Sequence, residues 1–131
     1  MAPTAPYRRT PKGRDVRAVF ADIDTFDPAR FVAHLTEDAE FRFANAPVVK
    51  GREAIGEAVA AFFATIDGLT HHVHHVWEVG DTSIAQTDVE YRRKDGRTVI
   101  VPNADILVFE GELARDWRIY IDLAPLYAEV T

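Results

Sequence analysis

The spacing of apolar residues changes at Gly68, and this change constrains the fold more than any other feature of the sequence. Before Gly68 the apolar residues recur at helical spacing; after it they alternate with polar residues, as in half-buried strands. The second half therefore predicts a meander of strands over residues 70–79, 83–94, 97–109 and 113–123. Turn-forming pairs separate these strands, at Gly80-Asp81, Asp95-Gly96 and Glu110-Gly111.

Three helices are predicted in the first half of the chain. They cover residues 15–23, residues 28–35 after the N-capping Asp27, and residues 52–67, with a short strand over residues 39–44 between the second and the third. Helices followed by a long meander are typical of the α+β class, in which helices cover one face of a curved antiparallel sheet.

The composition is that of one ordinary globular domain. Of the 131 residues 47% are hydrophobic, and the net charge is -6. Residues 1–13 contain several breakers, so we predict a flexible lead-in to a single domain over residues 14–131. The lack of cysteine excludes disulfides, thiolate catalysis and Cys-ligated zinc. The excess of acidic residues disfavours binding to nucleic acid. We expect neither a membrane span nor a signal peptide, and therefore predict a cytoplasmic protein.

Two-residue turns would fix the register of the strands, and with it the residues that share a face. One predicted face is largely apolar and carries Val89, Tyr91 and Trp117. The other mixes apolar and polar side chains, among them His71, Asp88, Asn103, Asp105, Arg118, Tyr120 and Asp122. Two arrangements stay open: the mixed face meets water and the apolar face meets the helices, or the mixed face encloses a pocket and the apolar face pairs with a second subunit.

Several segments, taken in order, resemble the nuclear transport factor 2 superfamily, and more narrowly its SnoaL-like, ketosteroid isomerase-like branch. The most specific are Gly51-Arg52-Glu53-Ala54-Ile55, at the start of the third helix, and Tyr120-Ile121-Asp122, in the last strand. The resemblance extends over about residues 15–127. It implies a cone in which a curved antiparallel sheet and three N-terminal helices enclose an internal pocket. It also implies a homodimer that forms through the apolar sheet face.

The resemblance implies candidate catalytic residues as well. Asp122 matches the position at which SnoaL-like cyclases and limonene epoxide hydrolases keep a catalytic carboxylate. Asp88 matches the second carboxylate of those hydrolases, and Asn45 lies in a segment similar to the one that supplies their water-orienting asparagine.

The chain departs from the hydrolases at two positions. Gln86 stands where they have an arginine, and Phe43 where they have a tyrosine. Arg118 is the predicted substitute for the arginine, because the expected register places it in the same cross-strand row as Asp88.

An apolar pocket raises the pKa of a carboxyl group toward neutrality, so Asp122 is predicted to transfer protons to or from an apolar substrate. Tyr120, on the same face, would donate to an oxygen that gains charge. The alternatives are that Asp122 caps the turn into Pro125 and that the ring of Tyr120 belongs to the core. The predicted substrate-binding wall consists of Phe20, Phe43, Phe62, Trp77, Val99 and Val101.

The chain contains a run of histidines after Thr70. His71 is predicted opposite Glu90, either as a catalytic dyad or as a surface pair at the rim of the sheet. His72 and His74 share a strand face, but no third ligand accompanies them, so no metal is predicted. A further predicted pair, Asp105 opposite Asp116, places like charges together and receives no functional role.

These expectations describe an enzyme that works by acid–base chemistry on a small hydrophobic molecule, without cofactor or metal. Isomerisation, cyclisation and epoxide hydrolysis all remain open as its reaction. The alternatives are a non-catalytic module that binds a small ligand and a dimerisation domain whose interior is filled.

Overall fold

The computed structural model of the chain describes residues 15–129. The predicted lead-in over residues 1–13 lies outside this range. None of the helices within it is long and apolar enough to cross a membrane. The elements, in chain order, are α1 (Val16–Ile23), α2 (Pro28–Val32), β1 (Leu35–Phe43), β2 (Val49–Lys50), α3 (Arg52–Phe63), β3 (Ile66–Val79), β4 (Thr82–Arg93), β5 (Thr98–Glu110), β6 (Leu113–Ile121) and α4 (Ala124–Tyr127).

The first two helices begin at side-chain caps. The carboxylate of Asp15 accepts a hydrogen bond from the Arg17 amide at 3.0 Å, and that of Asp27 accepts one from the Ala29 amide at 2.9 Å. Pro28 occupies the first turn of α2, where its missing N–H costs nothing. The predicted starts of these helices are confirmed.

Two of the helices are shorter than predicted. The chain leaves α2 at Val32 because Leu35 already pairs with Ala114 of β6. It leaves α3 at Phe63 because Ile66 already pairs with β4. In both places pairing in the sheet ends a helical pattern that continues in the sequence.

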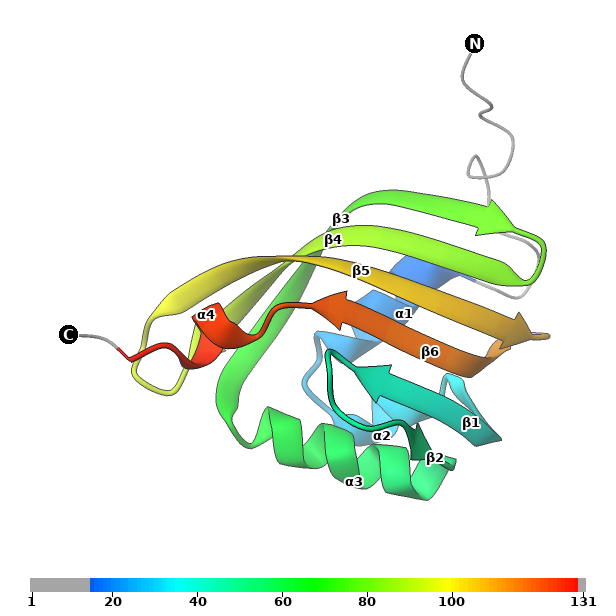
Figure 1. Ribbon diagram of the computed structural model, residues 1–131, viewed down its shortest axis with the longest axis horizontal. Helices are drawn as coiled ribbons and strands as arrows, with labels where there is room; N and C mark the ends of the chain where they lie inside the picture. Colours follow the sequence, from blue (N-terminus) through cyan, green and yellow to red (C-terminus); the bar gives the residue numbers. More distant parts are fainter. Residues whose placement is uncertain (1–14, 130–131) are drawn as a thin grey trace, which may run out of the picture.

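The sheet has six strands in the order β2-β1-β6-β5-β4-β3 (Figure 1). Its neighbours are antiparallel except β1 and β6, which run parallel. The sequence predicts an antiparallel sheet, and this parallel pair is a correction to it. A parallel pair needs a long crossover between its strands, and the segment from α3 to β5 supplies it.

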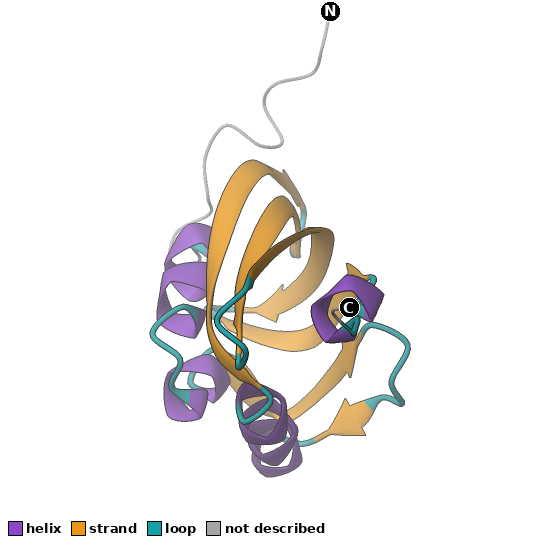
Figure 2. Cartoon of the chain, turned by 90° about the vertical axis from the view of Figure 1, so that its left-hand side faces the viewer, coloured by secondary structure: helices purple, strands orange, loops and turns teal. Residues whose placement is uncertain are grey.

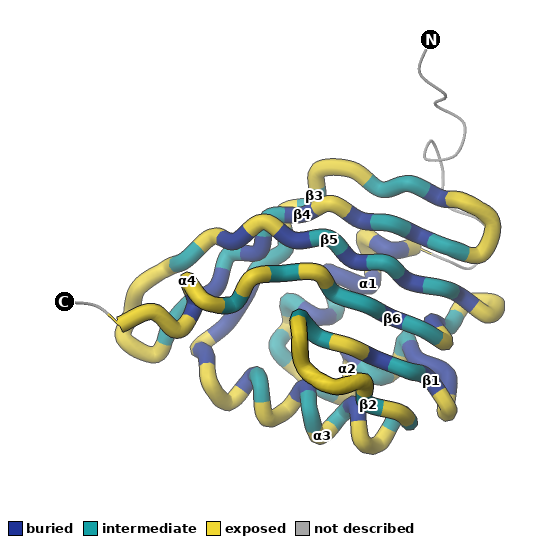
Figure 3. Tube along the Cα trace, viewed as in Figure 1, coloured by how far each residue is buried: buried dark blue, intermediate teal, exposed yellow. Residues whose placement is uncertain are grey.

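The sheet bends strongly, and α1, α2 and α3 lie on the same side of it (Figure 2). The buried residues of β4 and β5 alternate with more exposed ones along each strand (Figure 3). We call the face toward these three helices the inner face and the opposite one the outer face. The result is the predicted α+β cone, with helices and sheet around an interior.

The register of the strands differs from the predicted one at three places. The turn at Gly80-Asp81 is as predicted, with Val79 opposite Thr82, but a β-bulge at His74 then places His71 opposite Val89. The turn between β4 and β5 is longer than two residues, since the last pair that joins these two strands is Arg92 with Thr98.

The third difference lies in the hairpin of β5 and β6. Glu110 pairs with Leu113, so the turn is one residue further along than predicted, and a bulge at Arg115 follows. As a consequence Asp105 lies opposite Ile119, and the predicted Asp105–Asp116 pair does not form.

These shifts change which residues share a face, because a slip of one residue turns a side chain to the other side of a sheet. Val89, Tyr91 and Trp117 lie on the inner face together with Asn103 and Asp105. The prediction that separates these two groups is therefore wrong. The same shifts carry Asp88, Arg118 and Tyr120 to the outer face.

Candidate functional site

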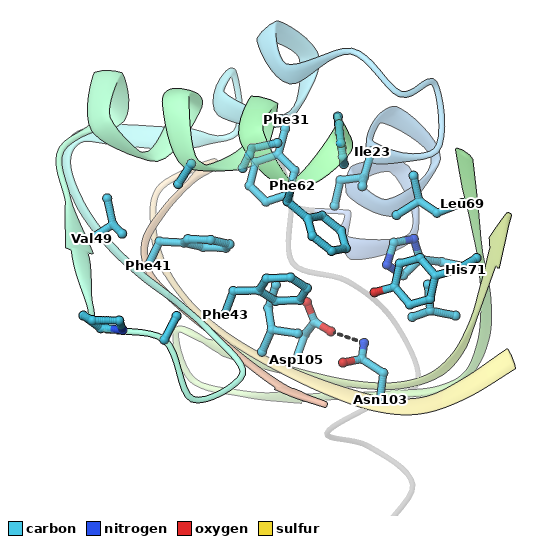
Figure 4. A pocket seen from close by; sticks show the side chains of 18 residues that line it. Ile23, Phe31, Phe41, Phe43, Val49, Phe62, Leu69, His71, Asn103 and Asp105 are labelled. Atoms are coloured by element: carbon cyan, nitrogen blue, oxygen red, sulfur yellow. Dashed lines mark hydrogen bonds between the residues drawn. The ribbon is translucent and has the colours of Figure 1, made fainter. Parts of the chain in front are cut away.

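A cavity of about 190 Å³ lies between the inner face of the sheet and the three helices (Figure 4). Its wall is mostly aliphatic and aromatic. The apolar lining residues are Ile23, Phe31, Phe41, Phe43, Ala46, Pro47, Val49, Ala58, Val59, Phe62, Phe63, Leu69, Val89 and Ile119. Ala46 and Pro47 are also exposed, so the cavity reaches the surface at the loop between β1 and β2. Four polar residues complete the wall: His71, Tyr91, Asn103 and Asp105.

Asp105, in the middle of β5, is the buried acid of this cavity. Only 1% of its surface is exposed. One carboxylate oxygen accepts a hydrogen bond from Trp117 Nε1 at 2.7 Å and the other accepts one from Asn103 Nδ2 at 2.6 Å. Burial raises the pKa of Asp105 above the ordinary value of 3.8, and the charge of His71 and the two hydrogen bonds offset part of that rise. Asp105 therefore keeps a proton at a higher pH than a solvated aspartate.

His71, in β3, is held by a carboxylate from the end of α1. The carboxylate of Asp24, at the end of α1, accepts a hydrogen bond from His71 Nδ1 at 2.6 Å and another from the His71 backbone amide at 2.8 Å. The ring stacks on Phe20, with 4.7 Å between the ring centroids. A carboxylate only accepts, so Nδ1 carries the proton of the neutral ring and Nε2 keeps its lone pair.

Tyr91, in β4, supplies a hydroxyl group to the same cavity. Burial, together with the negative charge of Asp105, raises the pKa of this phenol. It therefore remains protonated at neutral pH, when it can donate a hydrogen bond to an oxygen of a bound molecule.

The cavity thus brings together a base, an acid and a hydrogen-bond donor in apolar surroundings. His71 Nε2 can take a proton, and Asp105 can release one. A group that accepts a proton and a group that donates one, placed around the same bound molecule, are the requirements of general acid–base catalysis. The apolar wall strengthens electrostatic interactions with a bound molecule, because little water is present to screen them.

The arrangement offers no metal site. Within residues 15–129, no three His, Asp or Glu side chains are grouped so that they would hold an ion. On the outer face His72 Nε2 lies 3.1 Å from a carboxylate oxygen of Glu90, and His74 Nε2 lies 2.8 Å from one of Asp88. Each of these histidines is paired with an acid of the neighbouring strand.

Of the predicted site residues, three line the cavity: His71, Phe43 and Phe62. The predicted dyad of His71 with Glu90 is wrong, because the bulge at His74 places Glu90 opposite Thr70. The acid that pairs with His71 comes instead from α1, as Asp24.

The three predicted catalytic residues Asp122, Asp88 and Arg118 lie outside the cavity. Asp122 is exposed and accepts a hydrogen bond from the Ala124 amide at 3.0 Å, as in the capping alternative. Arg118 binds Asp116, with distances of 2.9 and 3.1 Å, and does not share a row with Asp88. The expected positions of these residues are wrong because the register differs from the predicted one, by one residue between β4 and β5 and by three between β5 and β6 around Asp105.

The remaining predicted residues are also absent from the cavity wall. Tyr120 is 60% exposed on the outer face, and Asn45 is exposed in the loop whose next two residues line the cavity. Trp77 lies on the outer face opposite Ile84. The rest of the predicted wall packs into the core, namely Phe20, Val99 and Val101.

Four residues of the site are absent from the predicted set: Tyr91, Asn103, Asp105 and Asp24. A signal for Asp105 is present, since an aspartate placed opposite Asp116 is unfavourable and indicates a wrong register. Asp24 gives no signal, because it lies 47 residues from His71 in the chain and only the packing of α1 against β3 joins them.

Comparisons with known proteins agree with this fold. The family model described as "SnoaL-like domain" matches residues 16–117. Among proteins with curated descriptions, none matches the chain significantly.

Solved structures resemble the chain over most of its length. A hypothetical protein with a ketosteroid isomerase-like fold from Catenulispora acidiphila, in complex with trimethylamine, has 22% identity and a TM-score of 0.81, covering 92% of each chain. A LEH-like epoxide hydrolase from M. tuberculosis has 13% identity and a TM-score of 0.71, covering 86% of this chain and 83% of its own. A putative SnoaL-like polyketide cyclase from Jannaschia has 17% identity and a TM-score of 0.72, covering 93% and 99%. At these identities the likeness shows the fold alone, which confirms the expected architecture.

Proposed function

We propose that this chain, which belongs to the SnoaL-like domain family, catalyses proton transfer within a small and largely apolar molecule. His71 acts as the base and Asp105 as the acid. The observation that carries the proposal is that these two residues line one cavity whose other walls are almost entirely apolar. This fold serves cyclases and epoxide hydrolases as well as proteins of unknown function, so the chemistry has to be argued from the site.

The base is argued from its hydrogen bonds. With Nδ1 donating to Asp24, the neutral ring of His71 offers Nε2 as the acceptor for a substrate proton. Protonation makes the ring an imidazolium, whose positive charge the carboxylate of Asp24 stabilises at once. Asp24 thus acts as a positioning residue, which also favours the charged product of the proton transfer.

The acid is argued from burial. The raised pKa of Asp105 keeps its proton available for transfer to the substrate atom that gains negative charge. When Asp105 has lost this proton, Trp117 Nε1 and Asn103 Nδ2 stabilise the carboxylate through the hydrogen bonds they already make. The hydroxyl of Tyr91 adds a donor that serves an enolate or alkoxide oxygen.

In an isomerisation the molecule loses one proton and gains one, so the number of protons is balanced. The proton that leaves one carbon goes to His71 Nε2, and the proton of Asp105 goes to the oxygen or carbon at the far end of the conjugated system. The charges of His71 and Asp105 interact across the cavity, so return of the proton from the imidazolium to the carboxylate restores the starting state. No cofactor enters this cycle.

A second candidate function is the binding of a small ligand without chemistry. The observation in its favour is that both oxygens of Asp105 already accept hydrogen bonds from the protein, which is also typical of a structural buried aspartate.

One experiment separates the two candidates. The exchange of the α-protons of 4-hydroxyacetophenone, a small ketone with one substituted ring and one hydroxyl group, is followed by NMR in D₂O with the wild type, Asp105→Asn and His71→Asn. Asparagine keeps an N–H group near the position of Nδ1 but offers no base at Nε2. We expect exchange above the solvent rate in the wild type alone. Ketone binding with equal, uncatalysed exchange in all three proteins would exclude the catalytic proposal and leave the ligand-binding one.

We also propose that the protein forms a homodimer through the outer face of the sheet. Ile100 and Tyr120 are 59% and 60% exposed there, and Trp77, Ile84 and Pro102 lie on the same face. The face predicted to be apolar, with Val89, Tyr91 and Trp117, is the inner one, so the proposed interface rests on these exposed apolar side chains among the charged residues of the outer face.

A further inference from the structure

We infer that the molecule bound in the cavity carries a hydrogen-bond donor, a hydroxyl or an N–H group, and that Asn103 Oδ1 accepts this hydrogen bond. The inference rests on the proposed function, because it names the class of substrate for the same cavity. It is carried by a different residue, however, and its test measures binding alone.

Asn103 holds an acceptor that the protein leaves unused. The residue is only 6% exposed. Among the buried side-chain oxygen and nitrogen atoms of residues 15–129, its Oδ1 is the one without a hydrogen-bond partner. Native proteins leave few buried polar atoms unpaired, so an unpaired acceptor on a residue that lines a cavity is a candidate partner for a bound molecule.

The direction of the Asn103 amide is fixed by its neighbours. Nδ2 donates to Asp105 Oδ1 at 2.6 Å and to Thr87 Oγ1 at 3.0 Å. Turning the amide over would place the carbonyl oxygen of Asn103 against Asp105 Oδ1, which is an acceptor both in the carboxylate and in the acid that carries its proton on Oδ2, so that two acceptors would face each other. Both hydrogens of the amide are thus used within the protein, and Oδ1 is left for another donor.

Asn103 lines the same cavity wall as Asp105 and lies across from His71 (Figure 4). A carbonyl oxygen has lone pairs and no hydrogen, so only a donor on the ligand can pair with it. A hydrocarbon, an ether or a ketone without a hydroxyl would bury Oδ1 unpaired. The site therefore selects against ligands that lack a donor, as sites with buried polar groups do.

The size of the cavity limits the rest of the molecule. A dry cavity of about 150 Å³ lined by apolar side chains holds benzene, and this one measures about 190 Å³. The predicted class is a molecule with one substituted ring, or an acyclic molecule of similar bulk, that carries one hydroxyl or N–H group. A hydroxyl beside the carbon skeleton is also what an enol or a phenol presents to an acid–base pair.

The test compares phenol with toluene, which have nearly the same shape and differ in one donor. Dissociation constants are measured at pH 7 for the wild type, Asn103→Leu and the control Ile119→Leu, which reshapes the same wall without removing a polar atom. We expect the preference for phenol over toluene to fall by about tenfold or more in Asn103→Leu, since tenfold corresponds to one hydrogen bond of ordinary strength. The control should keep the wild-type preference.

A measurement on the wild type alone covers the case in which Asn103→Leu does not fold. The ¹³C signal of the Asn103 side-chain carbonyl is followed while each ligand is added. We expect a shift with phenol that toluene does not cause. A phenol preference that survives in Asn103→Leu, or a shift at the Asp105 carboxyl in place of Asn103, would overturn the inference.

The two proposals fail separately. Absence of ketone exchange together with a phenol preference that depends on Asn103 would exclude the catalytic function and leave the donor requirement. Exchange by the wild type together with equal loss of phenol and toluene binding in Asn103→Leu would exclude the donor requirement and leave the catalytic function.

Discussion

Asp24 accepts two hydrogen bonds from His71, one from the ring Nδ1 and one from the backbone amide. This double contact joins the end of α1 to β3, the strand at one edge of the sheet. It fixes the ring in position and its proton on Nδ1. The side chain of His71 is 8% exposed and that of Asp24 is 21% exposed, so the pair is shielded from competing water.

Asp24→Asn should reverse the tautomer of His71. The asparagine oxygen can accept from only one of the two His71 donors, and its NH₂ group then faces the other. If the oxygen keeps the backbone amide, NH₂ points at Nδ1, which must become the acceptor, and the ring proton moves to Nε2. We expect ¹⁵N NMR to report this change and the exchange rate to fall by about a hundredfold, as when a general base is lost.

A matched control exists on the same helix. Asp22 also binds a histidine, with its Oδ2 2.8 Å from His34 Nε2, but both residues lie outside the cavity wall. Asp22→Asn should leave the His71 tautomer and the exchange rate unchanged. An equal loss in both variants would mean that Asp24 acts through the stability of α1 and not through the ring.

Trp117→Phe should destabilise the protein in a pH-dependent way. The change removes the donor to Asp105 Oδ2 and leaves a buried carboxylate oxygen unpaired, at a cost of about 2 kcal/mol. That hydrogen bond lowers the pKa of Asp105, so its loss raises this pKa further. The destabilisation, measured by urea unfolding, should therefore grow as the pH rises and Asp105 has to ionise.

The tryptophan on the outer face provides the comparison. Trp77→Phe changes the same residue type away from Asp105, and its effect should not vary with pH. Parallel curves for the two variants across the pH range would contradict the assigned role of Trp117.

The stability of the wild type should fall relative to that of Asp105→Asn as the pH rises above the unfolded-state pKa near 3.8. Burial raises the pKa of Asp105 in the native state, so between the two pKa values the native state binds more protons than the unfolded chain. Stability then decreases with pH, by at most about 1.4 kcal/mol per pH unit, until the native pKa is passed. Urea unfolding of both proteins at several pH values measures the difference, and a difference independent of pH would contradict it.

Ile100→Glu should convert the proposed homodimer to a monomer. The substitution places a charge at an exposed apolar residue of the outer face, where a partner would have to desolvate it. Val48→Glu changes another exposed apolar residue, in the loop after β1, and should leave the dimer intact. Sedimentation velocity distinguishes the species, and a monomeric wild type would exclude the proposal.

The fold was largely predictable from the sequence because periodicity and capping are local signals. The start of α2 at Asp27-Pro28 and the hairpin at Gly80-Asp81 follow from residue types within a few positions. The parallel pairing of β1 with β6 depends on contacts between distant parts of the chain, which local patterns do not encode.

The site was less predictable because it depends on strand register. Along β5 both alternating sets are largely apolar: Val101, Leu107 and Phe109 point inward, while Ile100 and Ile106 point outward. Alternation therefore does not distinguish the inner face of β5 from the outer one, and bulges at His74 and Arg115 add shifts that turn rules do not include.

The most direct test of the central claim is the titration of the Asp105 carboxyl carbon by ¹³C NMR, recorded beside the pH dependence of ketone exchange. The account predicts a midpoint well above 3.8 and an exchange rate that falls as Asp105 loses its proton. A midpoint at or below 3.8, or a rate that does not follow the ionisation of Asp105, would contradict its role as the acid.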